Sequence, residues 1–309
     1  MKRSIGVFAV VCLILTAFPM CAFAATVTTA NELAVILNGT GSTASDNGTV
    51  TLENKITLSD DIRLVLSEKV TLDLQGKKIT CETDISAFVI DTTDDCTFTV
   101  IDTAGGGSIT GGNGADGFDR EDSTEDDKYG KPGCQAICCD SGTVIIGGEG
   151  NGFSLSGGTG GNGADGAPAG GGGVGVSCKT GGTMKIMGVK DSSKAPLTIY
   201  GGDGNNTSGG ATTCGAGISH EGGNVEIGIA GTNGTEFNKN IIISGNVVSG
   251  GIAIACPEQE NDAGGSVTIY GGTITSFGDD KPCIKIDSGR TSCICINGGT
   301  ITSMERRIA

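Results

Sequence analysis

Two glycine-rich segments carry carboxylates in a pattern typical of calcium sites. Residues 111–119 match the nonapeptide Gly-Gly-x-Gly-x-Asp-x-apolar-x, and residues 160–168 match it at every position except the apolar one. Calcium prefers several hard oxygen ligands in a flexible loop. The carboxylates in or near the first copy that would supply these oxygens are Asp116, Asp119, Glu121, Asp122 and Asp126.

The spacing of the two copies leaves an alternative open. They lie 49 residues apart, whereas calcium-binding β-rolls place such nonapeptides in tandem. A solvated acidic loop is therefore the alternative to bound calcium. With calcium as the candidate ion, the candidate ligand-binding residues of the glycine-rich loops are Asp116, Asp119, Asp122, Asp165 and Asp203.

The single histidine, His220, falls at a repeated strand position whose equivalents are Cys139, Cys178, Cys256 and Ser288. Residues two apart on a strand face the same way, so stacked repeats would bring these side chains into one column. A metal or redox site made of Cys178, His220 and Cys256 is one interpretation. The other is an internal column of small buried thiols, because a free cysteine behaves as a small apolar residue.

No catalytic residue is predicted. Glycan-cleaving chemistry needs paired carboxylates on neighbouring turns or a base beside a calcium-binding cluster, and the pair Asp94 and Asp95 lies three repeats before His220. The glycine runs lack the strand-then-helix context of a phosphate loop. The outward positions of the second strand in each repeat share no functional type; they are Ile145, Lys185, Glu226, Thr268 and Cys295.

Composition argues against several classes of protein. The 309 residues include 56 glycines, 4% aromatic residues and no Trp, which disfavours an ordinary aromatic core and favours repeated tight turns. The formal net charge is −15. This charge argues against nucleic acid and anionic lipid as partners, because their phosphates would be repelled.

The N-terminus has the order of a secretory signal peptide. A basic start precedes an apolar run over 5–18, and Ala-Phe-Ala at 22–24 is a small-x-small cleavage site. We predict that 1–24 is a signal peptide and that the mature chain begins at Ala25, has no transmembrane segment, and is secreted or lies on the cell surface. Of the thirteen cysteines, eleven would remain. An odd number leaves at least one thiol free or paired between chains.

The mature chain begins with a helix pattern and continues with strand patterns. Residues 28–37 combine a threonine cap, Glu32 three residues after Thr29, and an apolar stripe, which predicts a short amphipathic helix. Beyond the following turn the apolar period changes to two, as in TVTL and VTLDL, so strands and turns are expected. We therefore assign 25–48 to an N-terminal capping helix and turn, and 49–309 to a repeat domain.

Variants of the motif VTIYGGTITS, which begins at Val267, recur through the repeat domain and give three short strands per unit. Stacking such units would bury a continuous column of apolar side chains, as in a solenoid. The first strands align at Ile137, Val176, Ile218, Ile254 and Ile286, the second at Val144, Met184, Val225, Val267 and Ile294, and the third at Leu155, Ile199, Ile242, Ile274 and Ile301. An earlier unit fits with 88–90, 98–100 and 108–110.

Three strands per unit, with a helix over the open N-terminal end, resembles the right-handed parallel β-helix of the pectin-lyase-like superfamily. Segments such as VTLDLQGKKIT and IYGGTIT are similar to those of glycine-rich, adhesin-like secreted and surface proteins of gut bacteria. The resemblance covers 28–303 and implies an all-β fold with a short capping α-helix. It concerns the fold, so what it implies for function is an analogy. The turn GISHEGG is faintly similar to the Gly-His-Gly turn of polygalacturonases, without their Asp-Asp and Arg-x-Lys partners.

The loops from the third strand of one unit to the first strand of the next vary in length, and stacking must gather them along one edge. This edge is either a binding face or a place that merely tolerates insertions. The loops run over 111–135, 157–173, 201–215, 245–251 and 277–282. The strand pattern stops after 300–302 without a capping element, so we expect further repeats or a partner at that end.

Three functions fit this pattern. The leading interpretation is a non-catalytic, adhesin-like protein that contacts an extracellular polysaccharide or surface ligand through the loop edge. The first alternative is a polysaccharide lyase or glycoside hydrolase of the same fold, which carboxylates on the outer face of one sheet in three adjacent units would favour. The second is a structural fragment of a larger surface protein.

Overall fold

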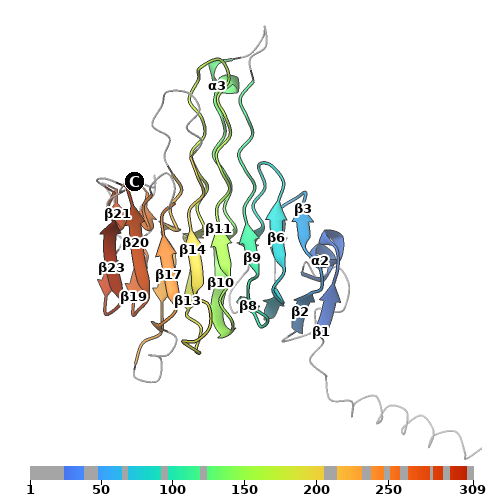
Figure 1. Cartoon of the computed structure of the whole chain (residues 1–309), viewed down its shortest axis with the longest axis vertical. Coiled ribbons are helices and arrows are strands. Elements are labelled where there is room, and N and C mark those ends of the chain that lie inside the picture. The colour runs from blue at the N-terminus through green and yellow to red at the C-terminus, as the bar shows by residue number, and fades with distance from the viewer. Residues whose placement is uncertain are drawn as a thin grey trace, which may run out of the picture.

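The computed structural model describes residues 24–37, 48–64, 69–91, 97–118, 124–204, 214–231, 238–246, 251–257, 264–278, 281–287 and 293–304. Within these ranges the chain is mostly β, with parallel sheets and two short helices. Rows of short strands lie side by side from the N-terminal to the C-terminal end of the molecule (Figure 1). Apart from Ala24, the predicted signal peptide lies outside the described residues.

The strands form three parallel ladders, in which each strand pairs with its counterpart from the next repeat. The first ladder contains β4 (Ile62–Leu64), β7 (Phe88–Asp91), the start of β10 (Ile137–Gly150), β12 (Val176–Lys179), β15 (Ile218–Glu221), β18 (Ile254–Cys256) and β21 (Ile284–Ile286). The second contains β1 (Ala24–Val27), β2 (Gly48–Leu52), β5 (Val70–Asp73), β8 (Thr97–Asp102), the rest of β10, β13 (Gly182–Met187), β16 (Asn224–Ile227), β19 (Ser266–Ile269) and β22 (Cys293–Ile296). The third contains β3 (Ile56–Leu58), β6 (Lys78–Cys81), β9 (Ser108–Thr110), β11 (Ser154–Ser156), β14 (Leu197–Tyr200), β17 (Ile241–Ser244), β20 (Thr273–Phe277) and β23 (Thr300–Met304).

Inward-facing side chains of the second ladder stack in the predicted register. Val144 pairs with Met184, which pairs with Val225, and Val225 pairs with Val267. All four side chains are fully buried, and Ile294 continues the column at its partly buried end. Each such side chain stabilises the stack by about 1.5–3 kcal/mol through burial. The alternation of apolar and polar residues therefore predicted this core correctly.

Two positions of the predicted alignment are wrong. Ile199 pairs with Ile243 rather than with Ile242, and Ile243 is fully buried whereas Ile242 is partly exposed. In the first ladder, Ile284 occupies the position predicted for Ile286. Three consecutive isoleucines give no alternation that could fix the register, and a slip of one residue exchanges the two faces of a strand. A slip of two residues keeps the face, so the pattern could not exclude it either.

The helix α2 (Ala30–Leu37) begins at the predicted cap. The backbone N of Glu32 donates to Thr29 Oγ1 at 3.2 Å, and the Glu32 carboxylate accepts hydrogen bonds from the backbone N of Thr28 and of Thr29. This reciprocal arrangement satisfies N–H groups that the first turn leaves free. Leu33 and Leu37 are buried, and α2 contacts β1, β3 and β4, the N-terminal strand of each ladder. The predicted helix is confirmed, while β1 was missed by the sequence pattern.

A second helix also departs from the prediction of strands and turns alone. α3 (Glu125–Lys128) is a single turn at the tip of the first long loop, where Thr124 and Asp127 form a capping box (Figure 1). No described helix is long and apolar enough to cross a membrane.

The three ladders end at β21, β22 and β23. The side chains of Ile286, Ile296 and Ile301 are exposed there, unlike the equivalent side chains in the middle of the chain. Further repeats or a partner at this end stay a prediction.

Candidate functional site

The variable loops lie side by side, as predicted, and their stems rise from the third ladder toward α3 (Figure 1). We call the layer that they form the glycine stack. It consists of six described segments: 111–118, 157–164 and 201–204 lead away from the ladders, and 128–135, 167–175 and 214–217 lead back. These segments lie within or next to the loops predicted to share one edge.

Backbone hydrogen bonds join the outgoing segments at every third residue. Gly114 N donates to Thr159 O at 2.8 Å, and Gly117 N donates to Asn162 O at 2.7 Å. A period of three is that of the polyproline II helix, whose backbone makes no internal hydrogen bonds. All of its N–H and C=O groups are therefore available to neighbouring segments, and here those neighbours come from the next repeat.

The returning segments are bonded into the same layer with the same period. Gly158 N donates to Cys134 O at 2.9 Å, and Gly161 N donates to Lys131 O at 2.8 Å. Cys134 N in turn donates to Gly112 O at 2.8 Å. Each long loop is thus held by its own return and by the adjacent loop, through backbone hydrogen bonds that recur along its length.

Close packing explains why glycine recurs in these segments. A Cβ atom added to Gly158 would lie 1.9 Å from Gly112 O, and one added to Gly161 would lie 2.0 Å from Ala115 O. Both partners are backbone atoms, which cannot move aside as a flexible side chain can. Collagen has the same requirement at its crowded axis. The glycines therefore serve the close approach of backbones.

Polar side chains recur at every third residue on two outgoing segments of the glycine stack. Asn113 and Asp116 are three residues apart on the first outgoing segment, and Thr159 and Asn162 are three apart on the next. Asn113 Oδ1 accepts a hydrogen bond from Thr159 N at 3.0 Å. Asp116 Oδ1 accepts from Asn162 N at 2.7 Å and from Asn162 Nδ2 at 3.0 Å. Along each segment these polar side chains are spaced roughly 9 Å apart, because three residues of a polyproline II helix rise 3.1 Å each.

The other candidate ligand-binding residues are distributed over the same layer. Asp203 is half-buried on the third outgoing segment, and its backbone O accepts from Gly160 N at 2.9 Å. Asp165 is exposed at the tip of the second loop, with its carboxylate 3.8 Å from Lys128 Nζ. Asp119 and Asp122 lie outside the described residues. The structure thus brings Asp116 and Asp203 into one layer and leaves Asp165 at its end.

The calcium prediction is not decided by this geometry. Within the described part of the chain, no group of three or more His, Cys, Asp or Glu side chains is placed to hold a metal ion. One carboxylate oxygen of Asp116 already accepts the two hydrogen bonds from Asn162. Calcium at the glycine stack therefore stays a prediction.

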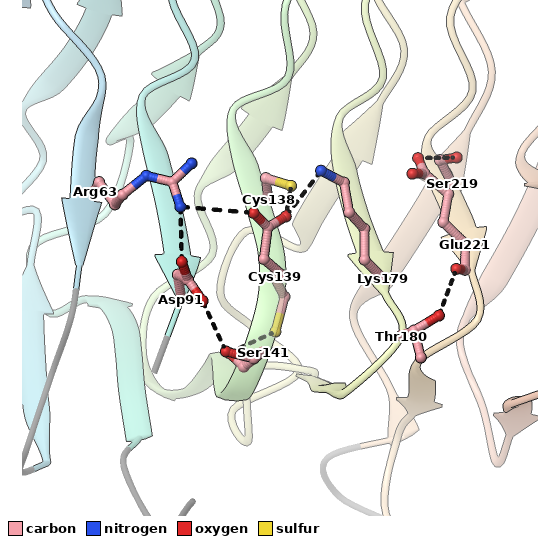
Figure 2. A network of polar contacts seen from close by, with 10 residues as sticks. Arg63, Asp91, Cys138, Cys139, Ser141, Lys179, Thr180, Ser219 and Glu221 are labelled. Carbon is pink, nitrogen blue, oxygen red and sulfur yellow. Dashed lines mark hydrogen bonds and ion pairs between the residues drawn. The ribbon is translucent and has the colours of Figure 1, made fainter. Parts of the chain in front are cut away.

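A second polar cluster crosses the first ladder, where charged side chains of successive repeats meet (Figure 2). Arg63 Nη1 lies 2.8 Å from Asp91 Oδ2 and 4.0 Å from Asp140 Oδ2. Lys179 Nζ lies 2.9 Å from Asp140 Oδ1. The next repeat contributes Glu221, whose carboxylate accepts a hydrogen bond from Ser219 at 2.9 Å. Each cation of this row therefore lies beside at least one carboxylate, and the two neighbouring carboxylates of Asp91 and Asp140 share Arg63.

The environment of Asp140 keeps its carboxyl ionised. Burial acts to raise its pKa, but the hydrogen bonds from Cys138 and Lys179, with the charges of Lys179 and Arg63, hold the pKa below its ordinary value. A general acid requires the opposite shift. Asp91 and Asp140 lie in adjacent repeats, but the third position holds Lys179. These ion pairs join neighbouring strands, and each exposed pair contributes about 0–1 kcal/mol to the stability of the fold.

The predicted column of cysteine and histidine side chains is confirmed: these residues stack in register, and their side chains are buried. Cys139 pairs with Cys178, which pairs with His220, and all three are fully buried. Cys256 is buried in the following repeat, and Ile286 pairs with it, so the position predicted for Ser288 belongs to Ile286. His220 Nε2 contacts Gly223 O at 2.6 Å, and Cys178 Sγ donates to Asn224 O. These contacts with backbone oxygens favour the buried-thiol interpretation.

Sequence reasoning missed two features of these sites. The three-residue glycine period was readable as Gly111, Gly114 and Gly117, but these glycines also satisfy the calcium nonapeptide. The charged row of the first ladder was missed because only the outward positions of the second strand were compared, and because Arg63 belongs to a repeat before the aligned units.

Comparison of the chain with protein-family models, with curated proteins and with solved structures finds no match. The fold and the site geometry therefore carry the functional argument.

Proposed function

We propose that this protein is a secreted or cell-surface, non-catalytic right-handed parallel β-helix, adhesin-like in character, that contacts extracellular glycans through the glycine stack. Three parallel ladders with three strands per repeat, and α2 against the first strand of each ladder, support the β-helix. The resemblance to glycine-rich members of the pectin-lyase-like superfamily supports the surface location, as does the signal-peptide pattern of 1–24.

The observation that carries the proposal is the fixed position of polar side chains on the glycine stack. Asn113 and Asp116 each hydrogen-bond to the adjacent loop, so their side chains are held before any ligand arrives. Binding then costs less conformational entropy than it would on mobile loops. Amide and carboxylate groups in regular rows suit a ligand that presents regularly spaced hydroxyl groups, as a glycan chain does.

The experiment measures retention and cleavage together. The secreted protein is incubated with a panel of insoluble plant and host polysaccharides, with and without calcium, and both the protein on the solid and the sugar in solution are assayed. We expect retention without release. The double variant Asn113→Ala with Asp116→Ala should be retained less, whereas Glu53→Ala, which removes an exposed acid from the turn between β2 and β3, should behave as the wild type.

Each outcome has a consequence. Release of sugar would overturn the non-catalytic assignment and favour a lyase or hydrolase of this fold. Equal retention of the double variant and the wild type would remove the glycine stack from the binding surface. Calcium-dependent retention would point to the loop over 111–135, which contains Asp116.

A further inference from the structure

A groove runs along a different edge of the molecule, where the second strand of each repeat turns into the third. Its volume is about 530 Å³, within the range of small-ligand sites. Its lining comes from four successive repeats, at Pro196, 238–242, 270–273 and 299–300. Neighbouring strands are about 4.8 Å apart, so the groove extends roughly 14 Å along the stack.

Glycines of two successive repeats, Gly271, Gly272 and Gly299, belong to the lining of this groove. In the turn from β19 to β20, Gly272 has φ +90, and a Cβ atom on Gly271 would lie 2.4 Å from Asn238 O. Gly299 has φ +93 at the equivalent turn of the next repeat. Neither backbone conformation is easily adopted by a residue with a side chain. These glycines contribute no side chain to the lining, whose side chains come from Pro196, from 238–242 and from the residues beside the glycines.

The walls combine an aromatic ring, hydroxyl groups and one cation. Tyr270 is half-buried, and Thr273 and Thr300 are exposed at the rim. Lys239 is exposed and forms no ion pair with any described residue. None of the described residues that line the groove is acidic, although the chain contains 35 acidic and 20 basic residues. Among the described residues of the lining, the one charged side chain is therefore the cation Lys239.

We propose that this groove binds an acidic oligosaccharide, with Lys239 on a carboxylate or sulfate group and the ring of Tyr270 against the apolar face of a sugar. An ammonium group forms charge-assisted hydrogen bonds with either anion, and Tyr offers an apolar body with a polar tip. The threonine hydroxyls donate to and accept from sugar hydroxyl groups. This site is separate from the glycine stack and goes beyond the function proposed for that surface.

The test titrates the full secreted chain by calorimetry with three hexasaccharides: an oligoglucuronate, a sulfated dextran oligosaccharide and its neutral parent. We expect the acidic probes to bind and the neutral one to bind at least tenfold more weakly. Tighter binding of the oligoglucuronate would indicate a carboxylate ligand, and tighter binding of the sulfated oligosaccharide would indicate a sulfate ligand. Lys239→Gln should weaken acidic binding about tenfold and reduce its salt dependence. Tyr270→Ala should weaken it further.

Two controls keep the outcome interpretable. Lys78→Gln removes an exposed cation from β6 and should leave binding unchanged. Asp116→Ala should also leave it unchanged, so failure of the glycine stack as a surface and failure of this groove are distinguishable. Equal affinity for acidic and neutral probes, or undiminished binding by Lys239→Gln, would overturn the proposal. Lys239 and Thr273 are exposed, so Lys239→Gln and Thr273→Val test the groove even if Tyr270→Ala does not fold.

Discussion

Asp116 and Asn162 are 46 residues apart in sequence and joined by two hydrogen bonds in the structure. The Oδ1 atom of Asp116 accepts from Asn162 N at 2.7 Å and from Asn162 Nδ2 at 3.0 Å. Both groups lie on the outgoing segments of adjacent loops. One carboxylate oxygen of the first loop therefore holds both the backbone and the side chain of Asn162 on the second loop.

The variant Asp116→Ala tests this link. It leaves Asn162 N without its acceptor, and a hydrogen bond to a charged group contributes about 1.5–3 kcal/mol. We expect hydrogen exchange at the Asn162 amide to accelerate by at least about tenfold. The amide of Thr159, which bonds to Asn113, is the internal reference and should change little. Unchanged exchange at Asn162 would show that this bond does not hold the loops together.

Glycine at position 161 is the target of the second prediction. Gly161→Ala places a Cβ atom 2.0 Å from Ala115 O, so the two segments must separate, at a cost of about 3 kcal/mol. Gly166→Ala is the matched control, because nothing lies within 4 Å of its added Cβ. Because Gly166 has φ +79, an alanine there would destabilise the fold by about 1 kcal/mol through its backbone conformation alone. Limited proteolysis should cut the loops of Gly161→Ala much faster than those of Gly166→Ala. Equal rates would contradict the close packing described above.

Thiol labelling distinguishes the buried column from the surface. Hydrogen bonding with Cys139, followed by burial, raises the pKa of Cys178 far above that of a free thiol. The side chain of Cys295 is exposed. We expect iodoacetamide at pH 8 to label Cys295 and spare Cys178 in the folded protein, and to label both in guanidinium chloride. Rapid labelling of folded Cys178 would argue for a reactive site in place of a packed core.

Stability should also depend on alkaline pH through Cys138. Burial, with the hydrogen bond to Asp140 as the next cause, raises the pKa of the Cys138 thiol from 9.0 to about 12. The unfolded chain then releases this proton first, so the free energy of unfolding falls as pH rises from about 9 toward 12. The urea midpoint measured at pH 8 and pH 10.5 should fall less in Cys138→Ala than in the wild type. An equal fall would assign the pH dependence to other groups.

Two neighbouring isoleucines give a test of register. Ile243 is fully buried, so Ile243→Ala should lower the free energy of unfolding by about 2–5 kcal/mol. Ile242 is partly exposed on the other face of β17, and Ile242→Ala should cost about 1 kcal/mol. Thermal unfolding followed by circular dichroism compares the two. A larger loss for Ile242→Ala would restore the register that the sequence pattern had suggested.

Much of the fold was predictable because apolar alternation records which face of a strand is buried. Val144 and Met184 stand in clean alternation, and their register was predicted correctly. The register at Ile243 was not, because its neighbours are equally apolar. The strand β1 was missed since Ala24–Val27 lies beside the predicted cleavage site, where the targeting pattern dominates the interpretation.

The position of the candidate site could be predicted from the sequence, but the hydrogen bonds that hold its loops together could not. Repeat stacking alone requires the loops to share an edge, so Asp116 and Asp203 were assigned to it correctly. Their backbone partners come from other repeats, and the hydrogen bond from Gly160 N to Asp203 O leaves no local trace in the sequence. The groove that contains Lys239 was missed for the same reason, because Lys239 and Tyr270 come from different repeats and line one groove only when the repeats stack.

The three-residue period of the glycine stack also limits how these loops can change in length. Adding one residue to a stem would move side chains onto the positions of Gly158 and Gly161, where no Cβ atom fits. Adding three residues to each side restores the contacts and extends the stem by one turn. A stem can therefore lengthen only in whole turns, and shorter adjustments are confined to the tip. The reach of each loop above the ladders is thus set in discrete steps of roughly 9 Å.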